Sequence, residues 1–215
     1  MPRWIWILLA TSLAALLWAA QRSPSAATAP ATGGTTPAAA CLLPPGPSAG
    51  NDPVQTDVPA NLAAFNSGDF TITPLAGIGI QARVLGREDY RLDAGAALSP
   101  TDLALGWRQM ADPAHYGQLD ISQSGRWYHY RWGNAGPPLP LAEIIRSSAN
   151  MHLIPADATV AQAIKRVQAG QTVRLQGWLV EARRSDGWHW RSSLTREDSG
   201  DGSCELIYVC ALSSY

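Results

Sequence analysis

Alternating and continuous apolar runs divide residues 70–209 into short predicted elements. Strands are expected where β-branched residues alternate with polar ones between turn residues, most regularly in TVRLQGWLVEA at 172–182. A helix is expected at 157–170, where Val160, Ile164 and Val167 recur at helical spacing before Gly170. The predicted strands are 70–75, 79–86, 126–132, 149–154, 172–182, 188–194 and 204–209, and the predicted helices are 99–112, 140–148 and 157–170.

This order of elements predicts an α+β fold. Short strands joined by local hairpins, such as the one turning at Ser185-Asp186-Gly187, favour an antiparallel sheet over a parallel one. We therefore expect a curled antiparallel sheet or a small OB-like barrel with three short helices.

An apolar segment precedes this domain. Residues 4–20 carry no charge, and as a helix they would be roughly 25 Å long, close to the ~30 Å hydrocarbon core. The run is longer than a usual signal-peptide core, and Trp18 would occupy the −3 position of a cleavage site at Ala20. These features favour a retained transmembrane helix, with a cleaved signal as the alternative.

The positive-inside rule gives the orientation of this segment. Arg3 and the amino terminus precede it and only Arg22 follows closely, which predicts a cytoplasmic N-terminus. The expected location is the inner membrane with the domain in the periplasm, or the periplasm itself if the signal is cleaved. The cytoplasmic membrane is thus one expected partner.

Three regions of different composition follow from this pattern. Residues 1–22 form the anchor or signal segment, and residues 23–60 are rich in Ala and Pro and predict a flexible, disordered linker. Residues 61–215 have a mixed composition and a length typical of a single globular domain.

The three cysteines favour thiols that are not joined to each other. Cys41 lies about twenty residues beyond the apolar run, too far for a lipid-attachment site. Cys204 and Cys210 would be roughly 20 Å apart on a straight strand, so they can pair only if the tail turns back.

Charge argues against nucleic acid as a partner. Residues 61–215 contain 14 of the 16 basic and 15 of the 17 acidic residues, so the domain has no basic excess. Proteins that bind the phosphate backbone normally have one, because phosphate neutralisation supplies much of their affinity. No nucleic-acid ligand is expected.

Standard catalytic motifs are absent from the sequence, so the candidate chemistry rests on strand faces. Alternation places a histidine beside polar residues on each of three predicted strands, at His129, His152 and His189. If these faces converge, the histidines would form a hydrolytic site, possibly metal-dependent; otherwise they are solvent faces of half-exposed strands. No ligand spacing is present, so neither a metal nor a cofactor is predicted.

Aromatic residues near the same strands suggest a binding surface instead. Tryptophans beside arginines would suit stacking against a glycan or a single-stranded nucleic acid, although such residues more often pack in cores. The candidate binding surface consists of Trp127, His129, Arg131, Asn150, His152, Trp188, His189, Trp190 and Arg191.

Four longer motifs resemble an uncharacterised family of proteobacterial envelope proteins. They are SPTDLALGW (99–107), DISQSGRWY (120–128), SSANMHLIPAD (147–157) and WHWRSSLTREDSGDGSCEL (188–206). The resemblance implies a bacterial envelope location and no particular activity. The preferred function is a membrane-tethered, non-enzymatic binding or scaffolding module with an envelope protein or glycan as ligand; an envelope hydrolase is the alternative.

Overall fold

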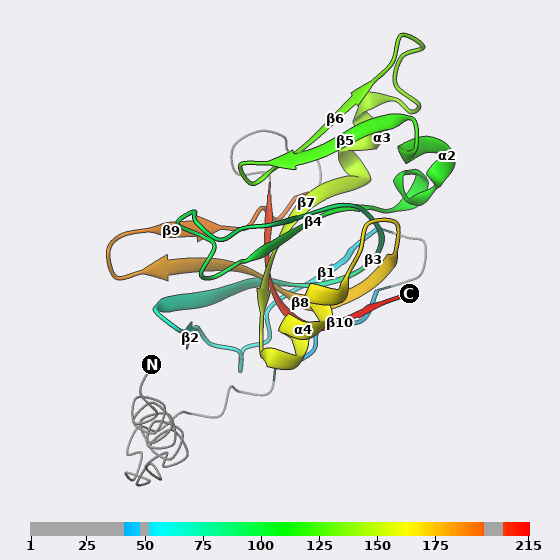
Figure 1. Ribbon diagram of the computed structural model, residues 1–215. Helices are drawn as coiled ribbons and strands as arrows, with labels where there is room; N and C mark the ends of the chain where they lie inside the picture. The colour runs from blue at the N-terminus through cyan, green and yellow to red at the C-terminus, as the bar shows by residue number, and fades with distance from the viewer. Residues whose placement is uncertain (1–40, 48–51, 196–203) are drawn as a thin grey trace, which may run out of the picture. The chain divides into compact units, whose positions relative to one another are not determined.

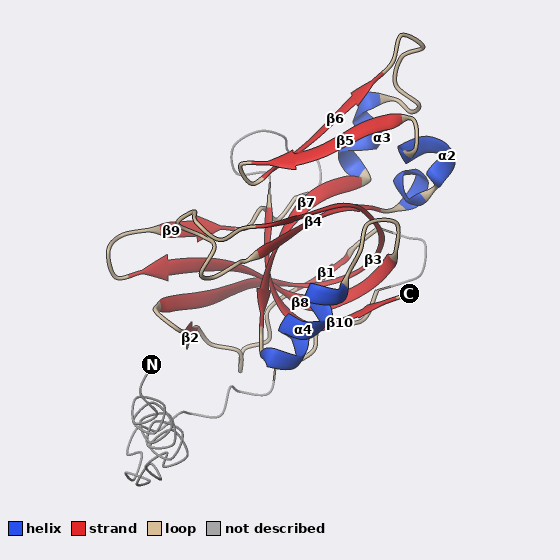
Figure 2. Cartoon of the chain, in the orientation of Figure 1, coloured by secondary structure: helices blue, strands red, loops and turns tan. Residues whose placement is uncertain are grey.

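The computed structural model describes residues 41–47, 52–195 and 204–215 (Figures 1 and 2). They belong to one compact unit that runs from Pro37 to Tyr215. The strands are β1 (Val54–Thr56), β2 (Phe65–Ser67), β3 (Phe70–Asp89), β4 (Thr101–Gly106), β5 (Leu119–Ser124), β6 (Trp127–Trp132), β7 (Ser148–Pro155), β8 (Thr172–Arg184), β9 (His189–Arg191) and β10 (Glu205–Ser214). The helices are the 3-10 helix η1 (Arg108–Ala111) and the α-helices α2 (Pro113–Tyr116), α3 (Leu141–Arg146) and α4 (Ala158–Arg166).

Five strands pair in a closed ring. β3 pairs with β4, β4 with β7, β7 with β10, β10 with β8, and β8 again with β3. Only the β7–β10 pairing is parallel, and the other pairings of the ring are antiparallel. The sheet-rich α+β prediction is therefore confirmed.

The interior of the ring is an aliphatic core. Inward positions alternate along the strands, as at Leu103 and Leu105 on β4 and Met151 and Leu153 on β7, all fully buried. Helix α4 covers this core with Val160 and Ile164, as its apolar stripe predicts.

A second apolar cluster lies outside the ring. β3 and β8 continue past the barrel, and Phe70 and Val180 on these extensions pack with Ile154, Leu206 and Tyr208 of β7 and β10. The β3–β8 pairing has a register shift between Pro74 and Ala76, where β3 passes from the ring into its extension. The extensions thus cover part of the outer surface of β7 and β10.

The predicted helix at 99–112 is wrong in its first half. Residues 101–106 form β4, and all six are buried between β3 and β7. Pairing on both sides outweighs the helix-start signal of Ser99-Pro100, since local propensity is a weak preference. The side-chain N-cap in this region is Asp112 instead of Ser99. Asp112 precedes α2, and its carboxylate accepts a hydrogen bond from the Ala114 amide.

Two further element predictions need correction. The strands predicted at 70–75 and 79–86 are one continuous strand, β3. The predicted strand at 126–132 pairs with β5, which the sequence did not suggest, and together they form a separate two-stranded sheet. This β5–β6 hairpin packs on the barrel through a third cluster that includes Leu85, Met110 and Ile144.

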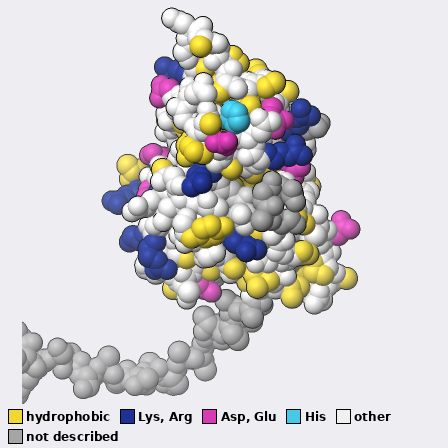
Figure 3. All heavy atoms as spheres, turned by 90° about the vertical axis from the view of Figure 1, so that its right-hand side faces the viewer, with side chains coloured by type: hydrophobic (Ala, Val, Ile, Leu, Met, Phe, Trp, Pro, Cys, Tyr) yellow, Lys and Arg dark blue, Asp and Glu magenta, His cyan; other side chains and the backbone are white. Residues whose placement is uncertain are grey.

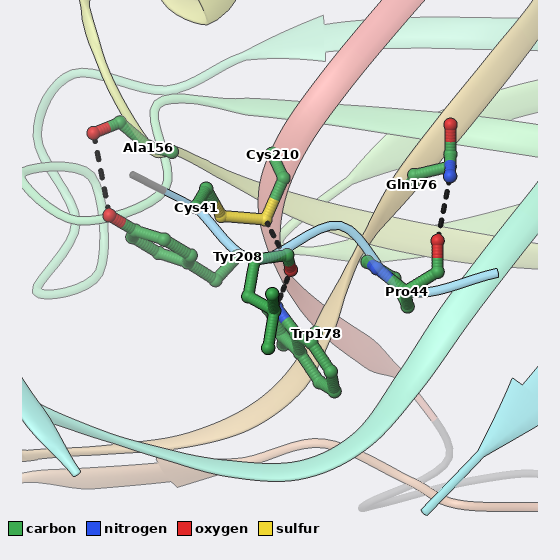
Figure 4. Close-up of a disulfide and its surroundings, with 8 residues drawn as sticks. Cys41, Pro44, Ala156, Gln176, Trp178, Tyr208 and Cys210 are labelled. Atoms are coloured by element: carbon green, nitrogen blue, oxygen red, sulfur yellow. Dashed lines mark hydrogen bonds between the residues drawn. A yellow bond between two sulfur atoms is a disulfide. The ribbon is translucent and has the colours of Figure 1, made fainter. Parts of the chain in front are cut away.

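Residues 41–47 lie against the barrel, although the sequence predicts a flexible linker there. Cys41 forms a disulfide with Cys210, with Cα atoms 5.4 Å apart (Figure 4). The indole nitrogen of Trp178 donates to the Leu42 carbonyl at 2.9 Å, and the Gln176 amide donates to the Pro44 carbonyl at 2.7 Å. We call residues 41–47 the strap.

The strap overturns two predictions. The linker prediction does not hold for residues 41–47, nor for β1 within 52–60, which pairs with β3. The prediction of unjoined thiols is wrong for Cys41 and Cys210, because the fold brings together residues 169 apart in sequence. Spacing along the chain carries no signal for such a pairing.

Among the described residues, no helix is long and apolar enough to cross a membrane. The predicted anchor or signal at 1–22 lies outside them, as does the linker from 23 to 40.

Candidate functional site

An open cleft of about 570 Å³ lies on the outer face of β7. Four segments border it: the loop between β3 and β4, the turn of the β5–β6 hairpin, β9 with the residue before it, and Cys204 just before β10. Figure 1 shows that β9 and the hairpin turn lie on the same side of the molecule. The lining residues are Asp93, Ala94, Gly95, Arg126, Trp127, His152, Trp188, His189, Trp190, Arg191 and Cys204.

Asp102 is the centre of a buried polar network beneath the cleft. Its side chain is completely buried on β4, directly opposite His152 on β7. Oδ2 lies 2.8 Å from Nδ1 of His152 and accepts a hydrogen bond of 3.3 Å from the Asn150 amide. Oδ1 accepts a 2.9 Å hydrogen bond from Arg126. A buried carboxylate needs such partners, since an unpaired one is strongly unfavourable.

Arg126 connects this network to the cleft. It follows Gly125 in the hairpin turn, and both residues have positive φ, 58° for Gly125 and 73° for Arg126. This pair of left-handed residues is typical of a tight two-residue hairpin turn. The turn projects the guanidinium group back toward the barrel, where Nη2 donates to both carboxylate oxygens of Asp93 at 2.9 Å.

Further contacts fix the guanidinium group of Arg126 in place. Nη1 also donates to the Ser99 carbonyl at 2.8 Å, and Cζ lies 3.8 Å from the centre of the Tyr90 ring. The backbone carbonyl of Arg126 accepts a hydrogen bond of 3.0 Å from the Asn150 side-chain amide. Arg126 is thus a preorganised group whose charge is balanced by Asp93 and Asp102.

The electrostatics of the rim follow from this pairing. Partial burial tends to raise the pKa of the Asp93 carboxyl, but hydrogen bonds from Arg126 and from the Gly95 amide outweigh it, so the pKa lies below its ordinary value. Burial raises the pKa of the Tyr90 hydroxyl. Asp93 therefore faces the cleft as a carboxylate at neutral pH.

Two tryptophans form an aromatic wall. The ring of Trp190 lies 4.4 Å from that of His152, and its other neighbour Trp188 meets it edge-on at 6.1 Å. Trp188 in turn packs edge-on against Phe70 at 5.4 Å. Both indoles are half-buried, so part of each ring borders the cleft while the rest is held by the barrel extension.

The structure brings together most of the predicted surface. Six predicted residues line the cleft: Trp127, His152, Trp188, His189, Trp190 and Arg191. Asn150 is buried beneath them and receives a hydrogen bond from Gln123. His129 and Arg131 are exposed on the hairpin and are not among the lining residues.

The three histidines, whose convergence the alternative hydrolytic site would require, do not all meet. His152 and His189 border the same cleft, but His129 lies outside it, 3.4 Å from the Ser124 hydroxyl. Across residues 41–47, 52–195 and 204–215, no group of three or more His, Cys, Asp or Glu side chains is placed to hold a metal ion.

Sequence reasoning missed Asp93, Asp102 and Arg126. Asp102 was not identified as a site residue because its segment was predicted as a helix, in which no pairing with His152 is expected. The Gly125-Arg126 pair gave a turn signal without indicating where the arginine side chain points. Once β4 and β7 are recognised as paired strands, the register alone aligns Asp102 with His152.

No protein-family model matches this chain, and neither a curated protein nor a solved structure shows significant similarity to it.

Proposed function

We propose that this chain is a periplasm-facing, non-enzymatic binding module of the bacterial envelope, with an OB-like barrel that takes its ligand in the cleft. The observation that carries this proposal is the position of the cleft on the barrel. In OB-folds, ligands bind the outer face of the second and third strands between the loops that join strands 1–2 and 4–5.

The strand order supports this comparison. The ring strands in chain order are β3, β4, β7, β8 and β10, with the third parallel to the fifth and α4 between the third and fourth. The cleft lies over β7, the third strand, whose cross-strand partner β4 supplies Asp102. The loop 90–100 and the β8–β10 connection, which contains β9, flank it.

The state of the polar residues favours binding over catalysis. Arg126 is held by Asp93, Asp102 and the Ser99 carbonyl, which makes the floor of the cleft rigid. A preformed cleft lowers the entropy lost when a ligand binds.

An exported location accounts for the disulfide. A bond between Cys41 and Cys210 requires an oxidising compartment such as the periplasm, since thiols in the cytoplasm are kept reduced. The uncharged segment at 4–20 would tether the domain to the inner membrane, or direct its secretion if cleaved. The motif resemblance to envelope proteins agrees with both forms.

Site-specific photo-crosslinking in intact cells tests the proposal. A photoreactive residue at position 189, exposed at the cleft, is expected to capture a defined envelope component. The same residue at position 159, exposed on α4, is the matched control. Equal crosslinking at both positions, or none at 189, would reject the cleft as the binding site.

One observation favours a second function, an envelope hydrolase. His152 borders the cleft, and its Nδ1 lies 2.8 Å from the Asp102 carboxylate, a pairing that a histidine general base often has. Turnover of ester or amide substrates by the purified protein, lost in His152→Gln, would support this alternative and overturn the non-enzymatic proposal.

A further inference from the structure

We infer that the cleft binds an uncharged glycan, recognised by stacking on Trp188 and Trp190 and by hydrogen bonds to the Asp93 carboxylate that Arg126 holds in place. This inference rests on the proposed binding function and specifies the chemistry of its ligand. It depends on the charge balance of the cleft, on the shape of its aromatic wall and on the fixed polar groups beside that wall.

The charge balance argues against a phosphate-bearing ligand. Two arginines line the cleft, and carboxylates already bind both of them. Arg126 pairs with Asp93 and Asp102, and Arg191 lies 3.3 Å from Glu181. Glu181 also binds Arg183, so the guanidinium groups in and beside the cleft are all paired with carboxylates. A nucleic-acid groove, by contrast, exposes an excess of cations.

The aromatic wall supplies apolar platforms. Trp188 directly precedes β9 and Trp190 lies within it. Their ring centroids are 6.1 Å apart, with the planes nearly perpendicular. Contacts with Phe70 and His152 hold the two rings, so stacking against them would require little ordering. A pyranose ring presents an apolar face of C–H groups that matches such a surface.

Fixed polar groups stand beside these platforms. Asp93 remains partly exposed, with 38% of its side-chain surface accessible, while Arg126 holds its carboxylate in place. This carboxylate can accept hydrogen bonds from sugar hydroxyls, while the Arg126 Nη groups that fix it are already engaged with Asp93, Asp102 and the Ser99 carbonyl. Apolar platforms flanked by a few convergent polar groups are the general pattern of a small-ligand site.

Binding to defined ligands tests the inference. We would titrate the full-length protein with chitotetraose, a neutral N-acetylated amino-sugar oligomer, and with other neutral oligosaccharides, following tryptophan fluorescence. A single-stranded oligothymidylate provides the phosphate-bearing comparison. The expected result is saturable binding of a neutral glycan. Its dissociation constant should change less than about twofold between about 50 and 500 mM salt, because salt screens only charged ligands.

Variants of the wall connect the binding to the cleft. Trp188→Ala is expected to weaken glycan binding by about tenfold or more, and Trp188→Phe to retain most of it, because a stacking ring remains. Trp132→Ala removes an exposed tryptophan outside the cleft and should leave binding unchanged. The retained binding of Trp188→Phe keeps the test decisive even if Trp188→Ala fails to fold.

The outcomes separate this inference from the broader proposal. Steeply salt-dependent binding of oligothymidylate, or no binding of any neutral glycan, would overturn the ligand class. If position 189 still crosslinks specifically to an envelope protein in that case, the binding function stands and only the glycan inference fails. If glycan binding is unchanged in Trp188→Ala and reduced in Trp132→Ala, the cleft is not the glycan site.

Discussion

Asp102 and His152 lie directly opposite each other on β4 and β7, and Nδ1 of the imidazole is 2.8 Å from Oδ2 of the carboxylate. Both side chains are essentially inaccessible to solvent, and Arg126 completes the group from the hairpin turn. This arrangement links the barrel to the turn of a peripheral hairpin. It therefore determines both the stability of the fold and the geometry of the cleft above it.

Removing the Asp102 carboxylate should destabilise the protein strongly. Asp102→Ala removes the buried carboxylate that pairs with the guanidinium of Arg126. Removing one partner of a buried ion pair costs about 3–5 kcal/mol. Urea unfolding measures this loss. Asp120→Ala, on the exposed face of β5, is the control and should change the free energy of unfolding by less than about 0.5 kcal/mol. Similar effects of the two substitutions would refute the role given to Asp102.

The disulfide should contribute a large share of the stability. Cys210→Ser is expected to lower the free energy of unfolding by about 2–5 kcal/mol, since the bond closes a long loop in the unfolded chain. Thermal unfolding with and without reductant measures this. The wild-type melting temperature should fall on reduction and that of Cys210→Ser should not. Peptide mapping that finds Cys41 and Cys210 unlinked in the oxidised protein would contradict the prediction.

Close packing of the strap against β3 should make Gly79 intolerant of a side chain. A Cβ atom there would lie 2.6 Å from the Pro45 carbonyl oxygen, so Gly79→Ala must displace the strap. Such overpacking costs about 1–3 kcal/mol, which chemical denaturation can measure. Gly133→Ala is the matched control, because no atom lies within 4 Å of its added Cβ. Equal stability of the two variants would show that the strap is not packed at this position.

The ion pair of Asp93 predicts a specific pH dependence. Its folded-state pKa lies below the unfolded value of about 3.9, so its contribution is present above that pH and is lost as the pH falls through the folded pKa. The difference in unfolding free energy between wild type and Asp93→Asn should be constant from about pH 5 to about pH 7. It should shrink below about pH 4. A difference that instead grows on acidification would contradict the assignment.

The sequence predicted the elements whose signals are local. The strand at 172–182 and the helix at 157–170 appear as β8 and α4 because periodicity and end signals agree there. β4 was missed because the local helix-start signal of Ser99-Pro100 gave no hint of its long-range pairing with β7, although Leu103 and Leu105 already alternate as in a strand.

The site was predicted in part for the same reason. Trp188, His189 and Trp190 are consecutive residues at the start of β9, so their grouping is visible in the sequence. Asp93, Asp102 and Arg126 come from three separate segments, and only the β4–β7 register and the hairpin turn bring them together. The disulfide depends likewise on where the strap packs.

Indole resonances give the most direct test of the account, because they report on the cleft residue by residue. In the full-length protein labelled with ¹⁵N at tryptophan, chitotetraose should shift the Nε1–H signals of Trp188 and Trp190. The buried Trp107 and Trp178, which do not line the cleft, should remain unchanged. Shifts confined to Trp132 on the hairpin, or no shift at any indole at saturating glycan, would contradict a glycan-binding cleft on this barrel face.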